Sequence, residues 1–453
     1  MSTAATVAVI LAAGKGTRMK SNRVKALFPL CGKPLAAYPI RAARTAGLER
    51  VVLVVGHQAD AVRASIGESV EYALQEPQLG TGHAVMCAEE ALHGFTGTMF
   101  VHVVDAPLLP AEMIRELIQA HRESGNAATL LTFRPADPAR YGRIVRNADG
   151  SVARIVEYCD AAPEIRAIGE VNSGTYCFEA PLVFAVLRGI TPDNDQGEYY
   201  LTDVIERLIA RGERVGAVAA PDERMAAGIN DRVQLAEAEA NLRQDIRRRH
   251  MLNGVTLLDP ASTFIDEDVE IGPDTVIHPF TLIYGNTKIG GDCVIGPSSR
   301  LLDMVIEENV EVISSWVEKS TIRAGAKVGP FSRLRPGCDI GPGVIIGNYS
   351  ELKNTRVGAD SDVHHVCYLG DATVGEGVNI GAGTITCNFD GKKKHPTKIG
   401  DHAFIGSGNL LVAPVEIGEN ALTGAGAVVT HDVPPGKVAY GAPARVVRDR
   451  EKS

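Results

Sequence analysis

The sequence has no hydrophobic run long enough to cross a bilayer. Its most apolar segment, residues 4–13, is far shorter than the ~20 residues that a membrane helix needs, and no basic stretch precedes it. A buried strand that leads into a glycine-rich turn explains this segment better. We therefore expect a protein without a membrane partner.

Paired cysteines and an excess of basic residues are also absent. The eight cysteines are scattered without a C-x-x-C pair, which argues against a structural zinc site and suits reduced thiols in the cytoplasm. The formal net charge is −9, so no extended nucleic-acid-binding surface is expected, although local basic patches are compatible with this charge.

What the sequence does contain is a period of six residues. A helix repeats at about 3.6 residues and a strand at about 2, so neither explains this period. A stacked solenoid does, because each side is then a short strand plus a corner, often with glycine next to the inward residue. A β-sandwich with chance spacing is the alternative, but the phase persists for too long. The inward positions form three runs: Ile265, Ile271, Ile277, Ile283, Ile289, Ile295 and Leu301; Ile322, Val328, Leu334, Ile340, Ile346 and Leu352; Ile399, Ile405, Leu411, Ile417, Thr423 and Val429.

The region before the repeats follows another pattern, and 453 residues exceed one ordinary core. Apolar runs and amphipathic stretches alternate there. Their order predicts an α/β domain with a Rossmann-like, mostly parallel sheet, whose ligands bind beyond the carboxyl ends of the strands. The expected strands are 7–11, 51–55, 98–104 and 128–133, and the expected helices are 35–46, 59–65 and 111–123.

Two polar segments follow predicted strand ends. The first is a loop with Gly14, Lys15, Gly16 and Arg18, in which glycines admit a polyphosphate and the cations neutralise it. The second begins at Asp105. The loop is neither a Walker A motif nor a dinucleotide fingerprint. On these residues alone, a plain turn for the loop and a helix cap for Asp105 remain open.

Several segments, taken together, carry a resemblance to a known family. Residues 11–19 with Lys25, 74–84, 141–144, 155–157, 171–174, 196–203 and 228–230 resemble the signatures of sugar-1-phosphate nucleotidyltransferases. With hexapeptide repeats after them, nearly the whole chain resembles the bifunctional N-acetylglucosamine-1-phosphate uridylyltransferase/glucosamine-1-phosphate acetyltransferase family. The resemblance implies a left-handed parallel β-helix for the repeats, and a homotrimer.

The resemblance also implies the residues of a first site. Arg18 and Lys25 would be catalytic cations, Asp105 and Asn230 would hold Mg²⁺, and Gln75 would recognise uracil. For Glu157, a plain surface charge is the alternative. Val103 and Val104 stand where the family commonly has an aromatic residue and glycine. UTP and the UDP-sugar would contact Leu11, Ala12, Ala13, Gly14, Lys25, Gln75, Gly80, Thr81, Asp105, Gly142, Glu157, Asn172 and Asn230.

A second site is expected where the repeats break, at residues 353–398, with an insertion at 388–396. Acetylation of an amine needs a base, and the ordinary pKa of histidine suits that role. His364 and His365 are adjacent, and the resemblance selects His365. A tolerated surface insertion is the alternative for 388–396, where Phe389 replaces the usual tyrosine. The resemblance implies that glucosamine 1-phosphate contacts Arg333, Lys353, Tyr368 and Asn379, and that acetyl-CoA contacts Ala382, Asn388, Phe389, Lys394, Ser407, Ala425 and Arg445.

The predicted organisation is a uridylyltransferase domain at 1–229, a connecting helix at 230–251 and an acetyltransferase domain at 252–453. The basic end of the helix suits a helix C-terminus, with a nucleic-acid-binding tail as the alternative. The expected enzyme acetylates glucosamine 1-phosphate with acetyl-CoA. It then transfers UMP from UTP to N-acetylglucosamine 1-phosphate, releasing pyrophosphate for cell-envelope synthesis. The rivals are a nucleotidyltransferase with a structural or regulatory β-helix and a non-catalytic scaffold that binds sugar nucleotides.

Overall fold

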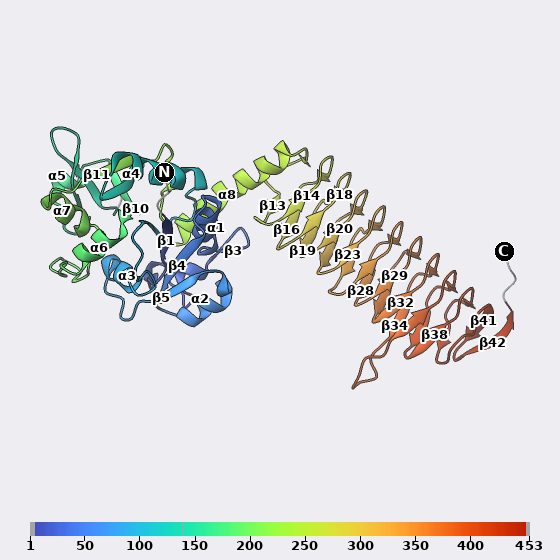
Figure 1. Ribbon diagram of the computed structural model, residues 1–453. Helices are drawn as coiled ribbons and strands as arrows, with labels where there is room; N and C mark the ends of the chain where they lie inside the picture. Colours follow the sequence, from blue (N-terminus) through green and yellow to red (C-terminus); the bar gives the residue numbers. More distant parts are fainter. Residues whose placement is uncertain (1–4, 139, 450–453) are drawn as a thin grey trace. The chain divides into compact units, whose positions relative to one another are not determined.

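The computed structural model describes residues 5–138 and 140–449. The chain divides into two compact units, 1–242 and 243–453 (Figure 1). The outermost ends of the two predicted domains, 1–4 and 450–453, lie outside the described residues. No helix in the described part of the chain is long and apolar enough to cross a membrane.

The first unit is built on one mixed sheet with the strand order β11-β7-β10-β6-β1-β4-β5. Neighbouring strands are parallel except at β10, which runs antiparallel to both β6 and β7. The mostly parallel sheet is confirmed, whereas β10 was not expected. The strands are β1 (Thr6–Leu11), β4 (Arg50–Val55), β5 (Glu71–Leu74), β6 (Thr98–Val103), β7 (Ala128–Phe133), β10 (Val171–Glu179) and β11 (Val215–Ala219), with β8 (Arg143–Arg146) and β9 (Val152–Val156) as a hairpin beside β10 and β2 (Pro29–Leu30) and β3 (Lys33–Pro34) as a separate pair.

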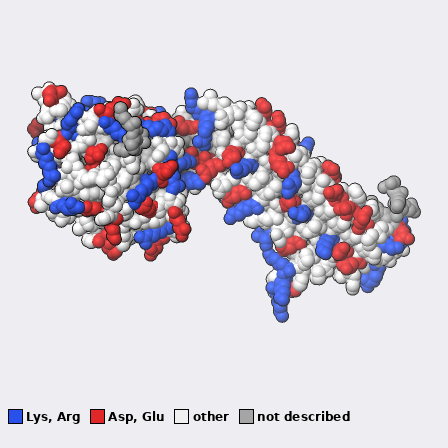
Figure 2. All heavy atoms as spheres, in the orientation of Figure 1, with Lys and Arg blue, Asp and Glu red and all other residues white. Residues whose placement is uncertain are grey.

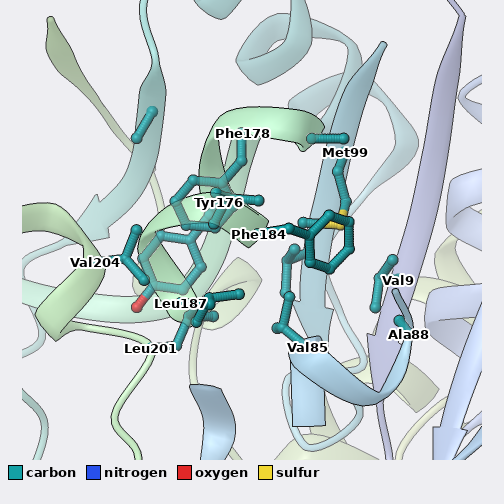
Figure 3. Packing of buried hydrophobic residues seen from close by; sticks show 14 of the residues in the cluster. Val9, Val85, Ala88, Met99, Tyr176, Phe178, Phe184, Leu187, Leu201 and Val204 are labelled. Atoms are coloured by element: carbon teal, nitrogen blue, oxygen red, sulfur yellow. The ribbon is translucent and has the colours of Figure 1, made fainter. Parts of the chain in front are cut away.

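Helices cover both faces of this sheet because its strands are apolar on both. Along β1, Val7 and Val9 enter one buried cluster, while Ala8 and Ile10 enter the other. Figure 3 shows the first cluster, in which Val9 lies among aromatic and aliphatic side chains. Helices α3 (Thr81–Cys87), α6 (Ala180–Leu187) and α7 (Asp203–Ala210) pack on the first cluster, and α1 (Ala37–Thr45), α2 (Ala59–Ile66) and α4 (Ala111–Ser124) pack on the second; α5 (Pro163–Arg166) follows the hairpin.

Helix α8 (Arg232–Leu252) spans the division between the units. Asp231 caps it, since its carboxylate accepts from the backbone N–H groups of Val233 and Gln234, both at 2.9 Å. In the second unit, Arg247 near the other helix end donates to the carbonyl oxygen of Pro260 at 2.7 Å. The basic end is thus held against the start of the repeats.

The second unit is a left-handed parallel β-helix with three sheets, since each strand from β12 to β37 pairs with the third strand after it. Sheet I comprises β12 (Thr256–Leu257), β15 (Val276–Ile277), β18 (Val294–Ile295), β21 (Glu311–Val312), β24 (Lys327–Val328), β27 (Ile345–Ile346), β30 (Asp362–Val363), β33 (Asn379–Ile380), β36 (Phe404–Ile405), β39 (Leu422–Thr423), β41 (Lys437–Gly441) and β42 (Ala444–Asp449). Sheet II comprises β13 (Phe264–Ile265), β16 (Leu282–Tyr284), β19 (Arg300–Leu302), β22 (Trp316–Glu318), β25 (Arg333–Leu334), β28 (Glu351–Lys353), β31 (Tyr368–Gly370), β34 (Ile385–Cys387), β37 (Leu410–Val412) and β40 (Val428–Val429). Sheet III comprises β14 (Glu270–Ile271), β17 (Lys288–Ile289), β20 (Val305–Ile306), β23 (Thr321–Ile322), β26 (Asp339–Ile340), β29 (Arg356–Val357), β32 (Ala372–Val374), β35 (Thr397–Ile399) and β38 (Val415–Ile417).

The six-residue period marks the interior of this column. All the predicted inward positions are buried except Ile271, which is half-buried in the first coil. At the other end of the stack, β42 pairs antiparallel with β41 and closes sheet I as a hairpin.

The predicted break at 353–398 is wrong for most of its length. Strands β28 to β35 continue the three sheets, with Val357, Val363, Leu369, Val374 and Ile380 buried inside. The phase slips because Leu352 and Val357, and again Leu369 and Val374, are five residues apart instead of six. Only the segment between β34 and β35 leaves the stack, and it projects as a loop (Figure 1).

Candidate active sites

Charged and amide side chains of the first unit meet beyond the ends of β1 and β6. Lys25 Nζ lies 2.6 Å from Asp105 Oδ2 and 3.1 Å from Asn230 Oδ1. Arg18 donates to the same Asn230 oxygen at 2.8 Å. The backbone N–H of Ile229 donates to the carbonyl oxygen of Asp105 at 2.7 Å and joins the two segments. Four residues predicted from separate segments therefore form one cluster, in which two oxygen atoms face two cations.

A glycine of the first loop makes this approach possible. Gly16 has φ +63°, and a Cβ atom there would lie 2.8 Å from Lys25 Cβ. Any larger residue would push Lys25 away from Asp105. Lys15, by contrast, points to a different hollow, lined by Gly56, Gln58 and Gln78 among others.

A pocket of about 370 Å³ opens beside the cluster. Glu157 lies in its wall and accepts a hydrogen bond from the Thr202 hydroxyl at 3.2 Å. Burial raises the pKa of Glu157, and the carboxylates of Asp160, Asp203 and Glu198 raise it further. Glu157 is therefore part of a pocket rather than of an open surface. Of the predicted residues, the pocket is lined by Leu11, Arg18, Thr81, Asp105, Gly142, Glu157, Asn172 and Asn230.

The same pocket contains tyrosines that the sequence analysis did not single out. The Tyr176 hydroxyl oxygen accepts from the Asn172 amide nitrogen at 2.6 Å, and Tyr141 accepts from the Gly228 N–H at 2.9 Å. The Tyr200 hydroxyl is buried and has no hydrogen-bond partner in the described structure. Tyr141 and Tyr200 lie within the motifs at 141–144 and 196–203, so those motifs located the segments but not which side chains face the pocket.

The residues expected around uracil lie nearby but outside the lining of this pocket, except Thr81. Gln75 is 3% exposed, and its amide nitrogen donates to the carbonyl oxygen of Gly80 at 2.9 Å. Thr81 accepts from the backbone N–H of Leu201 at 3.1 Å. Ala12 is buried and bonded to β4, Ala13 is buried, and Gly14 is exposed. Gln75 thus supports its own loop, and Thr81 ties that loop to the segment of Leu201.

In the second unit, three predicted residues share the outer face of sheet II. Strand register places Arg333 opposite Glu351 and Glu351 opposite Tyr368, with Lys353 two residues further along β28. The contact with Lys394 of the projecting loop lowers the pKa of the Lys353 ammonium. Two like charges held this close form a site for an anion.

Around Gly370, Tyr368 meets the projecting loop. A Cβ atom on Gly370 would lie 2.5 Å from the Tyr368 hydroxyl and 2.7 Å from the Asn388 amide nitrogen. That nitrogen donates to Asp371 at 2.6 Å. The loop itself is held by Asp390, whose pKa is lowered to about 2 by the Lys393 N–H, the His395 side chain and the Lys392 N–H. Figure 2 shows its exposed lysines, 392–394, gathered at the tip.

His365 lies on the edge of the column between sheets I and II. Its Nδ1 is 2.5 Å from the Asn348 amide oxygen one coil away. Because that oxygen only accepts, Nδ1 carries the proton and Nε2 remains an acceptor. His364 instead approaches Asp362, at 3.6 Å. No sequence motif marks Asn348, since it stands inside a regular repeat.

The predicted acetyl-CoA residues extend this edge. Gly383 donates to His365, Gly408 to Ala382, and Gly426 to Ser407, each through backbone groups. Ala382, Ser407 and Ala425 are therefore stacked in successive coils beyond His365. Asn379 lies apart on sheet I, opposite Asp362. Phe389 is exposed on the loop and Arg445 is on β42, so a single chain does not gather every predicted residue.

Comparisons with known proteins support both units. Residues 8–168 match the MobA-like NTP transferase domain, and residues 268–303, 319–354 and 396–431 match the bacterial transferase hexapeptide (six repeats). The bifunctional protein GlmU of Acetivibrio thermocellus is 48% identical over 98% of this chain and 96% of its own. That of Pelotomaculum thermopropionicum is 50% identical over 90% of this chain and 89% of its own.

The chain belongs to the GlmU family. The assignment covers both units, because one family model falls on the sheet domain and the other on the β-helix. As a GlmU protein, the chain is a bifunctional transferase that joins a nucleotidyltransferase to an acyltransferase. A solved UDP-glucose pyrophosphorylase with UDP-glucose is 19% identical, with a TM-score of 0.45, over 53% of this chain and 99% of that one.

Proposed function

We propose that the β-helix acetylates glucosamine 1-phosphate with acetyl-CoA and that the first unit then transfers UMP from UTP to N-acetylglucosamine 1-phosphate, releasing pyrophosphate. One observation carries this proposal: a two-cation, two-oxygen cluster beside a sugar-sized pocket occurs in the same chain as a histidine whose Nε2 can accept a proton. Because the eight cysteines are scattered without a C-x-x-C pair and suit reduced thiols, we place both reactions in the cytoplasm.

In uridylyl transfer a phosphate oxygen of the sugar phosphate attacks the α-phosphorus of UTP. Such transfers depend on positioning and on neutralising charge. Asp105 Oδ2 and Asn230 Oδ1 converge on one ammonium nitrogen and so fit a hard cation that prefers oxygen ligands. They would hold Mg²⁺, which supplies further charge neutralisation. Lys25 and Arg18 stabilise the charge that develops on the phosphates, while Glu157 and Asn172 orient the sugar.

In acetyl transfer the amine of glucosamine 1-phosphate attacks the thioester carbonyl. His365 Nε2 removes the proton from the amine as the C–N bond forms. The C–S bond then breaks and the coenzyme leaves as a thiol, with the proton returned to sulfur. Arg333 and Lys353 bind the sugar phosphate, and the small residues Ala382, Ser407 and Ala425 leave room for the pantetheine arm.

We infer a homotrimer from the three faces of the column. Sheet III carries ion pairs on its outer face, such as Lys288–Glu270 at 3.0 Å and Arg356–Asp339 at 3.4 Å. Sheets I and II also carry ion pairs, but they expose large aromatic side chains, including Phe404 and Trp316. Docking sheet I of one copy on sheet II of the next is a heterologous contact, which closes into a ring. It would also bring Asn379 of one copy to Tyr368 of its neighbour.

A coupled assay tests the proposal. Purified protein receives glucosamine 1-phosphate, acetyl-CoA and UTP, and free thiol and pyrophosphate are followed in time. Thiol is expected only when glucosamine 1-phosphate is present, and pyrophosphate after a lag that added N-acetylglucosamine 1-phosphate removes. Pyrophosphate without thiol release would establish the nucleotidyltransferase with a structural β-helix, and release of neither would establish a scaffold.

A further inference from the structure

A buried histidine lies beneath the turn that carries Asp105. His102 is the fifth residue of β6, between strands β1 and β10, and is 1% exposed. Its Nδ1 lies 2.8 Å from the Thr175 hydroxyl of β10, and its Nε2 lies 2.9 Å from the carbonyl oxygen of Ala106. An imidazole at this depth is costly unless both nitrogens are bonded, as they are here.

The two partners determine which nitrogen carries the proton. The Ala106 carbonyl oxygen only accepts, so Nε2 is the donor, and Nδ1 accepts from the Thr175 hydroxyl. Burial lowers the pKa of His102 to about 4, which keeps the ring neutral. The residue does not line the pocket, and both nitrogens are occupied, so it has no proton to exchange with a substrate.

The bond to Ala106 acts on the cluster through the backbone. Ala106 follows Asp105 directly, and the Asp105 carbonyl oxygen is held from the other side by the N–H of Ile229. Two consecutive carbonyls of this turn are thus bonded, one to β6 beneath and one to the segment of Asn230. The turn therefore has little freedom to rotate the Asp105 carboxylate, which meets Lys25 and faces the Asn230 oxygen.

We propose that His102 is a positioning residue. It holds the Asp105 carboxylate so that its oxygen and the Asn230 side-chain oxygen converge on one cation. The inference rests on the proposed uridylyl transfer. Groups that hold a metal ligand from behind typically alter affinity or activity about 10–100-fold when removed. Loss of the Nε2 donor frees the turn, so the two oxygen ligands no longer converge.

A matched set of variants separates positioning from packing. In His102→Gln the amide nitrogen takes the place of Nε2 and can still donate to Ala106. In His102→Asn the nitrogen takes the place of Nδ1 and cannot, and His102→Leu removes both bonds while filling similar space. Each full-length variant is compared in uridylyl transfer, in acetyl transfer and in Mn²⁺ binding by electron paramagnetic resonance without substrates.

For His102→Asn and His102→Leu we expect Mn²⁺ binding weakened about 10-fold or more and kcat of uridylyl transfer lowered about 10–100-fold. Acetyl transfer should be unchanged, which normalises the amount of enzyme because that site lies in the other unit. His102→Gln should stay within about 3-fold of the parent protein in Mn²⁺ affinity and kcat.

Equal Mn²⁺ affinity in His102→Gln and His102→Asn overturns the inference. If both are normal, His102 has no positioning role, and if both are weakened, it only fills space. If His102→Leu unfolds the first unit, the comparison of His102→Gln with His102→Asn still tests the inference. Absence of pyrophosphate release from the unmodified protein would instead contradict the proposed uridylyl transfer, while its Mn²⁺ affinity would still test the geometry.

Discussion

At the residue scale, the hydrogen bond from His365 to Asn348 separates two adjacent histidines. Asn348 orients the His365 ring and leaves Nε2 as the acceptor, whereas His364 faces Asp362. The sequence offered both as candidates, and only the resemblance distinguished them. Their partners come from residues 17 and 2 positions away, so adjacent residues have quite different environments.

We predict that His365→Ala lowers the rate of acetyl transfer about 10²–10⁴-fold, because the general base is lost. Uridylyl transfer should be unchanged, since that site lies in the other unit. Thiol release and pyrophosphate release are measured on one preparation, with His364→Ala as the matched control. A comparable loss in His364→Ala would show that the two histidines do not differ in role.

His102 also makes the stability of the first unit dependent on pH. Its pKa in the folded protein, about 4, is below the ordinary value of 6.5, so the unfolded chain binds more protons between these values. The contribution of the neutral His102 ring to the free energy of unfolding is therefore fully present above pH 6.5. It is lost as pH falls towards 4, by on the order of 3 kcal/mol.

Hydrogen exchange of the β6 amides between pH 7 and pH 4.5, corrected for intrinsic rates, measures this loss. In His102→Gln, which has no titrating group at this position, the pH dependence should be weaker. An unchanged dependence in that variant would assign the effect to other groups.

At the scale of elements, the sequence pattern predicted the regular coils of the β-helix but not the nature of the places where their six-residue period is interrupted. The aliphatic period located the column, because every coil buries the same position. The one-residue slips after Leu352 and Leu369 looked like a break, since spacing alone cannot distinguish a shorter corner from a missing coil. Antiparallel β10 was missed because its first half contains Asn172, Ser173 and Gly174 and so lacks the apolar run that predicts a strand.

For the sites, sequence motifs located segments, and only the fold revealed which residues meet. Arg18, Lys25, Asp105 and Asn230 lie far apart in the chain and converge. Asn379, predicted with Lys353 as a contact of glucosamine 1-phosphate, lies on another sheet of its own chain, because residues 26 apart fall on different sides of a three-sided coil. The contacts of Gln75 and Tyr200 depend on packing between loops, which no local pattern encodes.

The close stacking of coils makes Gly347 critical for the His365 edge. A Cβ atom on Gly347 would lie 1.8 Å from the carbonyl oxygen of His364. We predict that Gly347→Ala displaces the corner that carries His365, destabilises the column by about 3 kcal/mol or more, and greatly lowers acetyl transfer.

Calorimetric unfolding and thiol release test this prediction. Gly169→Ala is the control, because no atom lies within 4 Å of a Cβ placed there and its backbone is not in the left-handed region. Normal acetyl transfer by Gly347→Ala would mean that the coils separate easily, contrary to a rigid stack.

At the scale of the whole molecule, the proposed docking of sheet I on sheet II means that two copies would share each acetyl-transfer site, and this can be tested. We predict that Lys353→Ala and Asn379→Ala, each inactive in acetyl transfer alone, regain about a quarter of normal activity when co-expressed. A ring of three copies that mixes at random places the intact sheet II of Asn379→Ala against the intact sheet I of Lys353→Ala at about one site in four.

The control is co-expression of Lys353→Ala with Arg333→Ala, both on sheet II, which should restore nothing. Uridylyl transfer normalises the amount of enzyme in each mixture, and light scattering reports three copies per particle. No recovery with the first pair would place the whole acetyl site in one chain.

The antiparallel pairing of β42 has a consequence for self-association. Parallel strands stacked in register expose, at the end of the stack, the same unpaired backbone groups that let amyloid fibrils grow. Here the last partner of sheet I runs the opposite way and carries Arg445, Arg448 and Asp449. A second column would meet reversed hydrogen-bonding groups and charged side chains at that edge. The β41–β42 hairpin that ends sheet I therefore also opposes end-to-end joining of columns through this sheet.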